Sequence, residues 1–256
     1  MNKAISSVLT VYRNYRAAKA SNRAYRILRN LFASAGIGYL LLLSFPQPLF
    51  AHETSYKNLT VYSREPFDEN IYKVLDKVES RLNASEINNQ EVRPKIFLTG
   101  SFGFYSWLSL HIGGNSFGKG FGPIPTTNVF INKSDAANDL VFRNAPENNQ
   151  RSLSGVIAHE TTHLLIRKRF GYWRNVTMPA WKKEGYAEYV AGGSTLPYER
   201  GVQLWKANPK DGTGYQYFKY YMLVKYLLEH DKLSVDDLFN REFDVPSLEQ
   251  RVLSSL

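Results

Sequence analysis

The sequence predicts an α+β fold in which a small N-terminal mixed sheet with one helix precedes a mainly helical C-terminal half. The segments V-R-P-K-I-F-L-T (92–99) and N-V-F-I-N (128–132) are typical of strands, whereas helical spacing prevails from Ser152 onward. Strands followed by a run of helices favour this class. With 43% hydrophobic and 14% aromatic residues, the chain can bury one sizeable core, which excludes disorder as its overall state.

The positive charge of the chain is concentrated at its N-terminus. Residues 1–51 hold seven of the 32 Lys and Arg residues and no Asp or Glu. From His52 onward this leaves 25 basic against 23 acidic residues, a net charge of +2. A nearly neutral body lacks the electrostatic attraction that nucleic-acid binding requires, so we expect no nucleic-acid partner.

An apolar stretch from Leu31 to Phe45 follows the basic region. A positive flank, an apolar run and a break at Pro46 and Pro48 form the layout of a secretory signal, with Ala51 before the cut. The alternative is an uncleaved anchor. The prolines leave the run short for a spanning helix, which favours cleavage.

Both alternatives predict export of the body. We expect residues 1–51 to be a signal peptide or an N-terminal membrane anchor, and residues 52–256 to form the functional domain. An uncleaved segment would associate with the membrane through residues 31–50. The positive flank stays in the cytoplasm, so the domain is periplasmic or secreted, or anchored to the cytoplasmic membrane and facing outward.

One amphipathic helix is expected at 68–82, between the N-terminal segment and the first strand. Its apolar residues fall at helical spacing: Ile71, Val74, Leu75, Val78 and Leu82. The glycine-rich segment 113–123 lacks the G-K-[S/T] ending of a phosphate loop and the strand-loop-helix context. We therefore expect a mobile loop or turn beside a sheet edge there.

The C-terminal half is predicted to be mostly helical. A helix from Ser152 carries basic residues in its last turn and ends at Gly171, and a second helix opens at Pro179, where a missing N–H costs nothing. Three further helices are expected at 215–230, 233–240 and 246–254.

Residues 159–163 form the pattern H-E-x-x-H, in a chain without cysteine, which excludes thiolate metal sites and cysteine nucleophiles. Residues i and i+4 of a helix share a face, so His159 and His163 can reach one metal ion. Glu160 then projects to the adjacent side, where it can contact water bound to that ion. The alternative is a polar helix face whose histidines pair with neighbouring side chains.

The segment from Pro179 to Tyr189 supplies two more carboxylates, Glu184 and Glu188, at positions i and i+4. The twenty residues between His163 and Glu184 suffice to finish one helix, turn and return, which brings Glu184 to the metal as third ligand. Two histidines and one glutamate leave a fourth zinc position for water, as in catalytic sites. Glu188 is placed to accept the far N–H of a ligating histidine, and Gly185 to let the two helices approach closely.

H-E-x-x-H followed by W-x-x-E-G-x-A-E-Y resembles the gluzincin metallopeptidases. Within them the chain is similar to the peptidase MA-like group and, more distantly, to membrane alanyl-type aminopeptidases, over about residues 153–228. The resemblance implies a zincin-like domain that holds one Zn²⁺ per chain. The ligands that it implies are His159, His163 and Glu184. Glu160 is then the general base, and Glu188 supports a ligating histidine.

Tyr217-Phe218-Lys219 resembles the Y-x-K segment of the aminopeptidases, which implies that the Tyr217 hydroxyl stabilises the oxyanion. Helical aromatic residues are more often core, so Tyr221 remains an alternative for this role, and His230 is interpreted as a surface histidine. The G-x-M-E-N segment that holds a free amine in the aminopeptidases is missing, which leaves endo- or exopeptidase action open. In related folds the edge strand before the active-site helix pairs with extended substrate, and by analogy we expect residues 128–132 to be that edge strand.

These patterns predict a zinc-dependent peptidase that hydrolyses peptide bonds outside the cytoplasmic membrane, with Glu160 as general base on a zinc-bound water. Its partner is a peptide or protein substrate. The first alternative is a non-catalytic exported metal- or peptide-binding module with a zincin-like fold. The second is a membrane-anchored protein whose histidines only pack.

Overall fold

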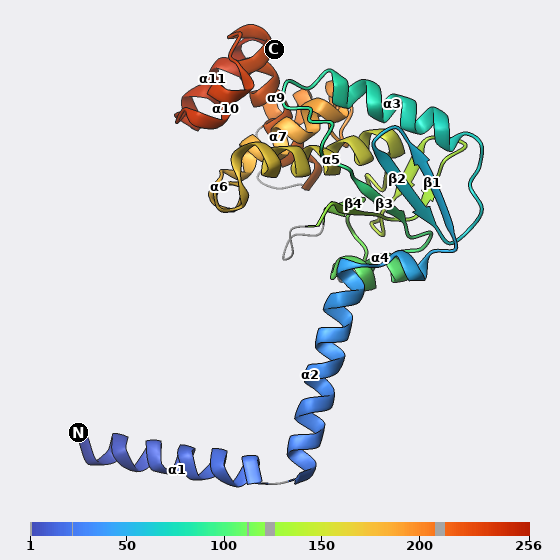
Figure 1. The fold of residues 1–256 in the computed structure, drawn as a ribbon. Helices are drawn as coiled ribbons and strands as arrows, with labels where there is room; N and C mark the ends of the chain where they lie inside the picture. The colour runs from blue at the N-terminus through green and yellow to red at the C-terminus, as the bar shows by residue number, and fades with distance from the viewer. Residues whose placement is uncertain (1, 22, 112, 121–125, 208–212) are drawn as a thin grey trace. The chain divides into compact units, whose positions relative to one another are not determined.

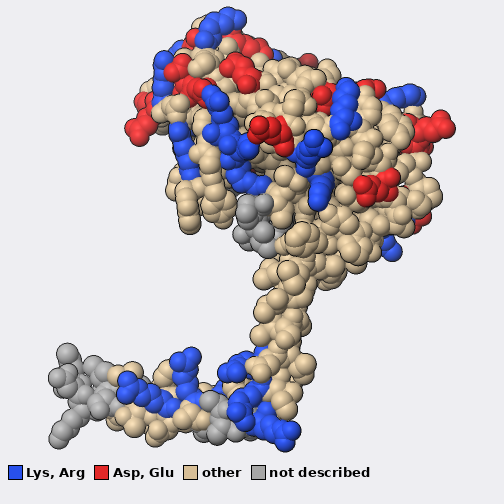
Figure 2. Space-filling view, in the orientation of Figure 1, with Lys and Arg blue, Asp and Glu red and all other residues tan. Residues whose placement is uncertain are grey.

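The computed structural model describes residues 2–21, 23–111, 113–120, 126–207 and 213–256. The chain forms two compact units, Met1–Pro46 and Gln47–Leu256. The first unit consists of helices α1 (Asn2–Ser21) and α2 (Arg23–Ser44). In this unit Lys and Arg side chains are visible and Asp and Glu side chains are not, as the charge distribution in the sequence predicts (Figure 2).

Helix α2 is long and apolar enough to cross a membrane. A signal sequence near the N-terminus passes the same test, so this helix fits both alternatives drawn from the sequence. The apolar run continues without a break to Ser44, and the prolines lie beyond it, in the short 3₁₀ turn η1 (Gln47–Leu49) and just before it.

The second unit begins with a five-stranded mixed sheet in the order β1-β2-β3-β5-β4. Its strands are β1 (His52–Tyr56), β2 (Leu59–Ser63), β3 (Lys95–Leu98), β4 (Gly118–Gly120) and β5 (Asn128–Ile131). Strands β2, β3 and β5 run parallel, and β1 and β4 are antiparallel to their neighbours at the two edges. The expected strands at 92–99 and 128–132 are thus present as β3 and β5. The hairpin of β1 and β2 was not predicted.

The position of β5 corrects one expectation. Residues 128–132 do not form a free edge, because β5 is paired on both sides, with β3 and with β4. The edge is β4, which comes from the glycine-rich segment expected to be a loop beside the sheet. Residues 121–123 of that segment lie outside the described residues.

The sheet buries both faces because residues alternate along β3. Ile96 and Leu98 join the main core with helices α3 (Ile71–Asn83) and α5 (Leu153–Phe170). Phe97 points to the opposite face, where its ring lies 5.0 Å from that of Phe50. Helix α4 (Phe102–Ser109) contributes Phe104 to this second aromatic cluster.

Helix α3 agrees closely with the predicted amphipathic helix. Every apolar residue that the spacing assigned to one face is buried: Ile71, Val74, Leu75, Val78 and Leu82. The helix packs against α5, as Figure 1 shows. The three residues before Ile71 do not join the helix, since it begins at Ile71 after Asn70.

The C-terminal half is helical, as predicted. Ser152 caps α5 by accepting a hydrogen bond from the amide of Gly155, and α5 ends at Gly171, whose φ of 84° favours glycine. The remaining helices are α6 (Tyr172–Thr177), α7 (Ala180–Ala191), α8 (Tyr198–Lys206), α9 (Thr213–Lys225), the π-turn η2 (Tyr226–His230), α10 (Val235–Asn240) and α11 (Val245–Ser254). In this half the sequence did not predict α6 or α8. A small antiparallel sheet of β6 (Ser134–Asp135), β7 (Leu140–Phe142) and β8 (Gln150–Ser152) precedes α5.

Helices α5, α7 and α9 pack against one another in the order α5–α7–α9. Gly185 makes a close helix contact possible, but with a different partner from the one expected. A Cβ on Gly185 would lie 2.4 Å from the carbonyl oxygen of Tyr220 on α9, so the glycine faces α9 and not α5. The approach of α7 to α9 therefore depends on a residue without a side chain.

Candidate metal centre

His159 and His163 lie one turn apart on the face of α5 that meets α7. Their Nε2 atoms are 3.1 Å apart, and the two rings stand nearly perpendicular, at 82°. His159 is buried and His163 is half-buried. The spacing of the H-E-x-x-H pattern thus brings both imidazoles to one point, as expected from the helical repeat.

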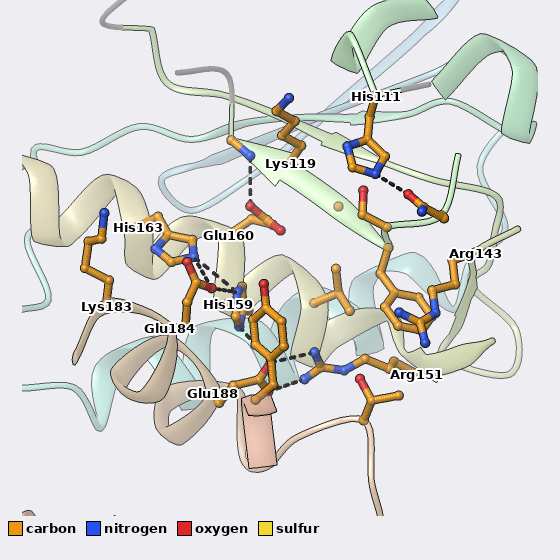
Figure 3. A pocket seen from close by; sticks show the side chains of 18 of the residues that line it. His111, Lys119, Arg143, Arg151, His159, Glu160, His163, Lys183, Glu184 and Glu188 are labelled. Carbon is orange, nitrogen blue, oxygen red and sulfur yellow. Dashed lines mark hydrogen bonds and ion pairs between the residues drawn. The ribbon is translucent and has the colours of Figure 1, made fainter. Parts of the chain in front are cut away.

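Helix α7 brings Glu184 to the same point. Its Oε2 lies 3.4 Å from the Nε2 of His159 and 3.4 Å from the Nε2 of His163 (Figure 3). Tetrahedral zinc with bonds of about 2.0–2.1 Å holds its ligand atoms about 3.3–3.4 Å apart. The three atoms therefore already have nearly the separation that a tetrahedral metal ion requires, and these residues are able to hold one.

The charges of the three side chains also suit a cation. Burial opposes ionisation of Glu184, but the imidazoles of His163 and His159 hold the pKa of its carboxyl well below the usual range. Burial likewise lowers the pKa of His163, and the Glu184 carboxylate more than offsets this, raising that pKa to about 9. The carboxylate thus favours positive charge beside the imidazoles, which a cation bound among the three groups would supply.

Glu160 lies next to this cluster but does not belong to it. Its Oε2 accepts a hydrogen bond of 2.8 Å from the amide of Gly120 on β4. Its Oε1 has no hydrogen bond to another described residue, so Glu160 is anchored through one of its two oxygens. The edge strand comes this close because Gly118 has no side chain: a Cβ there would lie 2.9 Å from Glu160 Cγ.

Glu188 lies behind His159 and is almost fully buried. Its Oε1 is 3.5 Å from the Nδ1 of His159, at ion-pair distance, but this nitrogen has no hydrogen bond. Both oxygens of Glu188 accept hydrogen bonds from Arg151 on β8, at 2.9 and 2.6 Å. Glu188 therefore lies beside His159 as expected, but the expected hydrogen bond is not formed. Its hydrogen-bond partner is Arg151, which the sequence did not indicate.

These side chains line a cavity of about 620 Å³. Tyr217 of α9 lines the cavity, while Tyr221 is not among its lining residues and packs beside the core. Burial, together with Glu184, Glu160 and Glu188, raises the pKa of Tyr217 above its ordinary value, which keeps the hydroxyl a hydrogen-bond donor. His230 is exposed and paired with Asp231, as expected for a surface histidine.

The sequence did not indicate three residues that shape this cavity, Gly118, Gly120 and Arg151. The two glycines are two residues apart, which on a strand places both on one face, and this face lies against α5. This spacing was available in the sequence, but it becomes informative only when β4 is known to be a strand. Arg151 is 37 residues from Glu188 in sequence, and nothing local connects them.

Comparisons with known proteins add no family to this description, because no family model matches the chain and no curated protein is significantly similar to it.

Proposed function

We propose that the chain is a zinc-dependent peptidase with a zincin-like domain, and that it hydrolyses peptide bonds outside the cytoplasmic membrane. The observation that carries the proposal is the convergence of two Nε2 atoms and one carboxylate oxygen at 3.1–3.4 Å, beside the carboxylate of Glu160. His159, His163 and Glu184 would hold one Zn²⁺ per chain. Nitrogen and oxygen donors without thiolate suit zinc in a hydrolytic site.

Each side chain has a defined task in this proposal. Bound zinc supplies Lewis-acid polarisation of the scissile carbonyl and lowers the pKa of water. Glu160, whose Oε2 is held by the Gly120 amide, takes the proton of the attacking water at Oε1 and delivers it to the leaving amine. Tyr217 donates a hydrogen bond to the developing oxyanion. Glu188, held by Arg151, keeps His159 in place.

The position of β4 supports a peptide as the substrate. The amide of Gly120 points away from β5 toward Glu160, so the outer edge of the sheet runs along the cavity. An extended peptide can align with such an edge strand through main-chain hydrogen bonds. A peptide bound there would lie beside both the general base and the metal ligands. This edge replaces residues 128–132 as the proposed substrate-pairing strand.

The test is digestion of a peptide library by the full-length chain in detergent, with metal analysis of the same sample. We expect about one zinc per chain, cleavage that stops when a chelator removes the metal, and recovery when zinc is restored. Stoichiometric zinc without cleavage would replace the proposal by a metal- or peptide-binding module. Absence of stoichiometric metal would leave histidines that only pack.

The packing at the start of the second unit, Gln47–Leu256, favours anchoring over cleavage of the N-terminal segment. Phe50 is only 8% exposed, and its ring lies 5.0 Å from Phe97 and 5.8 Å from Phe104. A cut after Ala51 would remove Phe50 and expose this cluster, at a cost of about 1.5–3 kcal/mol for one phenylalanine. Helix α2 then remains as the membrane anchor, and the domain that begins at Gln47 faces outward.

N-terminal sequencing and the intact mass of the protein from membranes test this localisation. We expect the α1 and α2 residues to be retained and the domain to be accessible to protease from outside. A mature N-terminus at or near His52 would instead show a cleaved signal.

A further inference from the structure

The hairpin of β7 and β8 brings two arginines to one face. Val141 pairs with Arg151, so Arg143, two residues beyond Val141, is a diagonal neighbour of Arg151 on the same side. Both guanidinium groups lie over the ring of Phe117, with their Cζ atoms 4.9 Å (Arg143) and 5.9 Å (Arg151) from its centroid. Both arginines line the same cavity as Glu160 and the three candidate ligands.

The two arginines differ in their partners. Arg151 donates to both oxygens of Glu188 and to the carbonyl of Gly193, so its charge is neutralised and its donors are used. Arg143 forms no ion pair or side-chain hydrogen bond with any other residue in the described part of the chain. Its Nε is buried without a partner.

An unpaired guanidinium in a partly buried position is costly, because it has lost water without gaining an anion. Burial, and then the positive charge of Arg151, lower the pKa of Arg143 from its ordinary value. A carboxylate bound in the cavity beside Arg143 would offset both the loss of water and the repulsion from Arg151. Planar, bidentate recognition of a carboxylate is the task to which arginine is best suited.

The charged side chains that line the cavity also favour an anionic ligand. Its described lining contains four cationic side chains, Lys119, Arg143, Arg151 and Lys183, and three carboxylates, Glu160, Glu184 and Glu188. A divalent cation bound at the candidate ligands would make the lining more positive still. In Figure 3, Arg143 lies on the side of the cavity away from His163 and Glu184, so an anion at Arg143 would not displace the candidate ligands.

We propose that Arg143 forms a carboxylate-binding subsite, which selects peptides that carry a carboxylate to one side of the scissile bond. This inference rests on the proposed peptidase function and names its substrate class. The carboxylate belongs either to the C-terminus of the substrate or to an Asp or Glu side chain. A C-terminal carboxylate would make the protein act near chain ends, and a side chain would make it select acidic sequences.

The experiment uses a matched set of four versions of a peptide that the full-length protein cleaves. One pair has Glu or Gln beside the scissile bond, and one pair has a free or an amidated C-terminus. For each peptide KM and kcat are measured with the wild-type protein, Arg143→Gln, Arg143→Lys and the control Arg200→Gln, which removes one exposed arginine of α8. Binding of the same peptides to Glu160→Gln protein is measured by calorimetry, so that affinity is read without turnover.

We expect the wild-type protein to favour the carboxylate-bearing member of at least one pair, Glu over Gln or a free over an amidated C-terminus. Its KM should be lower by roughly tenfold to hundredfold, the value of one charge-assisted contact. Arg143→Gln should abolish this preference, Arg143→Lys should keep part of it, and Arg200→Gln should keep all of it. The pair that shows the preference identifies the source of the carboxylate.

Two results would overturn the subsite. The first is a wild-type protein that binds and cleaves all four peptides equally well, which needs no variant and so does not depend on how Arg143→Gln folds. The second is a preference that survives in Arg143→Gln. If the library digest yields no cleaved peptide, the proposed function fails. Calorimetry of Glu and Gln peptides with free and amidated C-termini, on the wild-type protein and on Arg143→Gln, then still decides whether Arg143 binds carboxylates.

Discussion

Helices α2 and α5 are similar in length, at 22 and 18 residues, but they differ in which of their side chains are buried. Helix α2 is rich in leucine and other apolar residues, yet most of it is exposed, with Phe32 at 75% and Leu31 at 61%. Helix α5 buries 13 of its 18 residues, and five of these are polar: Ser154, His159, Glu160, Thr161 and Thr162. Apolar side chains left exposed on α2 and polar side chains enclosed on α5 both depart from the usual distribution of residues.

Burial of a polar group costs free energy unless it is paired, and two atoms of α5, His159 Nδ1 and Thr161 Oγ1, are buried without hydrogen bonds to described residues. Under the proposed function, these polar residues of α5 are explained by chemistry and the apolar surface of α2 by the membrane, and not by the stability of the fold. The apolar surface of α2 would be covered by lipid, a solvent that the protein itself does not provide.

The largest expected effect follows from Glu160→Gln, which tests whether a buried carboxylate of α5 is there for chemistry. Glutamine keeps the shape and the oxygen that accepts from Gly120, so metal content and the melting temperature should stay close to wild type. The kcat for peptide cleavage should fall by roughly 10²- to 10⁴-fold, the contribution of a general base. Undiminished turnover in this variant would remove Glu160 from the mechanism.

Glu184→Gln is expected to weaken zinc binding by more than about a hundredfold. Loss of a residue that merely supports a ligand already costs 10- to 100-fold in affinity, and here an ionised ligand is replaced by a neutral amide. Competition with a chelating dye measures the affinity. The exposed Glu199→Gln on α8 serves as control and should bind zinc like the wild type. Equal zinc affinity in the two variants would exclude Glu184 as a ligand.

Ile37→Arg tests whether the exposed face of α2 is covered by lipid. An arginine near the centre of the apolar run costs about 3–4 kcal/mol relative to isoleucine on insertion, so the variant should shift strongly from the membrane to the soluble fraction. Leu9→Arg, at an exposed position of α1, is the matched control and should remain in the membrane. Fractionation after carbonate washing gives the result, and unchanged retention of Ile37→Arg would argue against α2 as the anchor.

Gly185→Ala is expected to lower the free energy of unfolding by about 1–3 kcal/mol, because the new methyl group would overlap the Tyr220 carbonyl and push α9 away from α7. Gly103→Ala on α4 is the control, since a Cβ there meets nothing within 4 Å and alanine favours a helix. Chemical denaturation of both variants measures the difference. A Gly185→Ala protein as stable as the control would show that the α7–α9 contact can relax without cost.

Sequence reasoning succeeded where the signal is periodic and local. The buried face of α3, the start of α5 after Ser152 and its end at Gly171 were all predicted. The convergence of His159, His163 and Glu184 was predicted as well, because the spacing of the first two is set by the helical repeat and the chain between His163 and Glu184 is short.

It failed where partners are distant in the chain. Strand β4 was taken for a loop because a three-residue segment with two glycines has no strand signal. It is a strand because it pairs with β5, and it is an edge strand because β5 is its one neighbour in the described sheet. Gly185 was assigned to the wrong neighbour, since composition shows that a close approach is possible but not which helix approaches.

The amino-acid sequence by itself determined which side chains can share a helix face, and hence which groups can reach one cation, because a helix fixes that geometry over a few residues. Tertiary structure alone decided which of two arginines on the β7–β8 hairpin meets Glu188 and which has no side-chain hydrogen bond or ion pair within the described part of the chain. It also decided which strand borders Glu160. These outcomes depend on contacts between segments tens of residues apart. Packing decides which of these contacts form, and the local conformational preference of each segment does not.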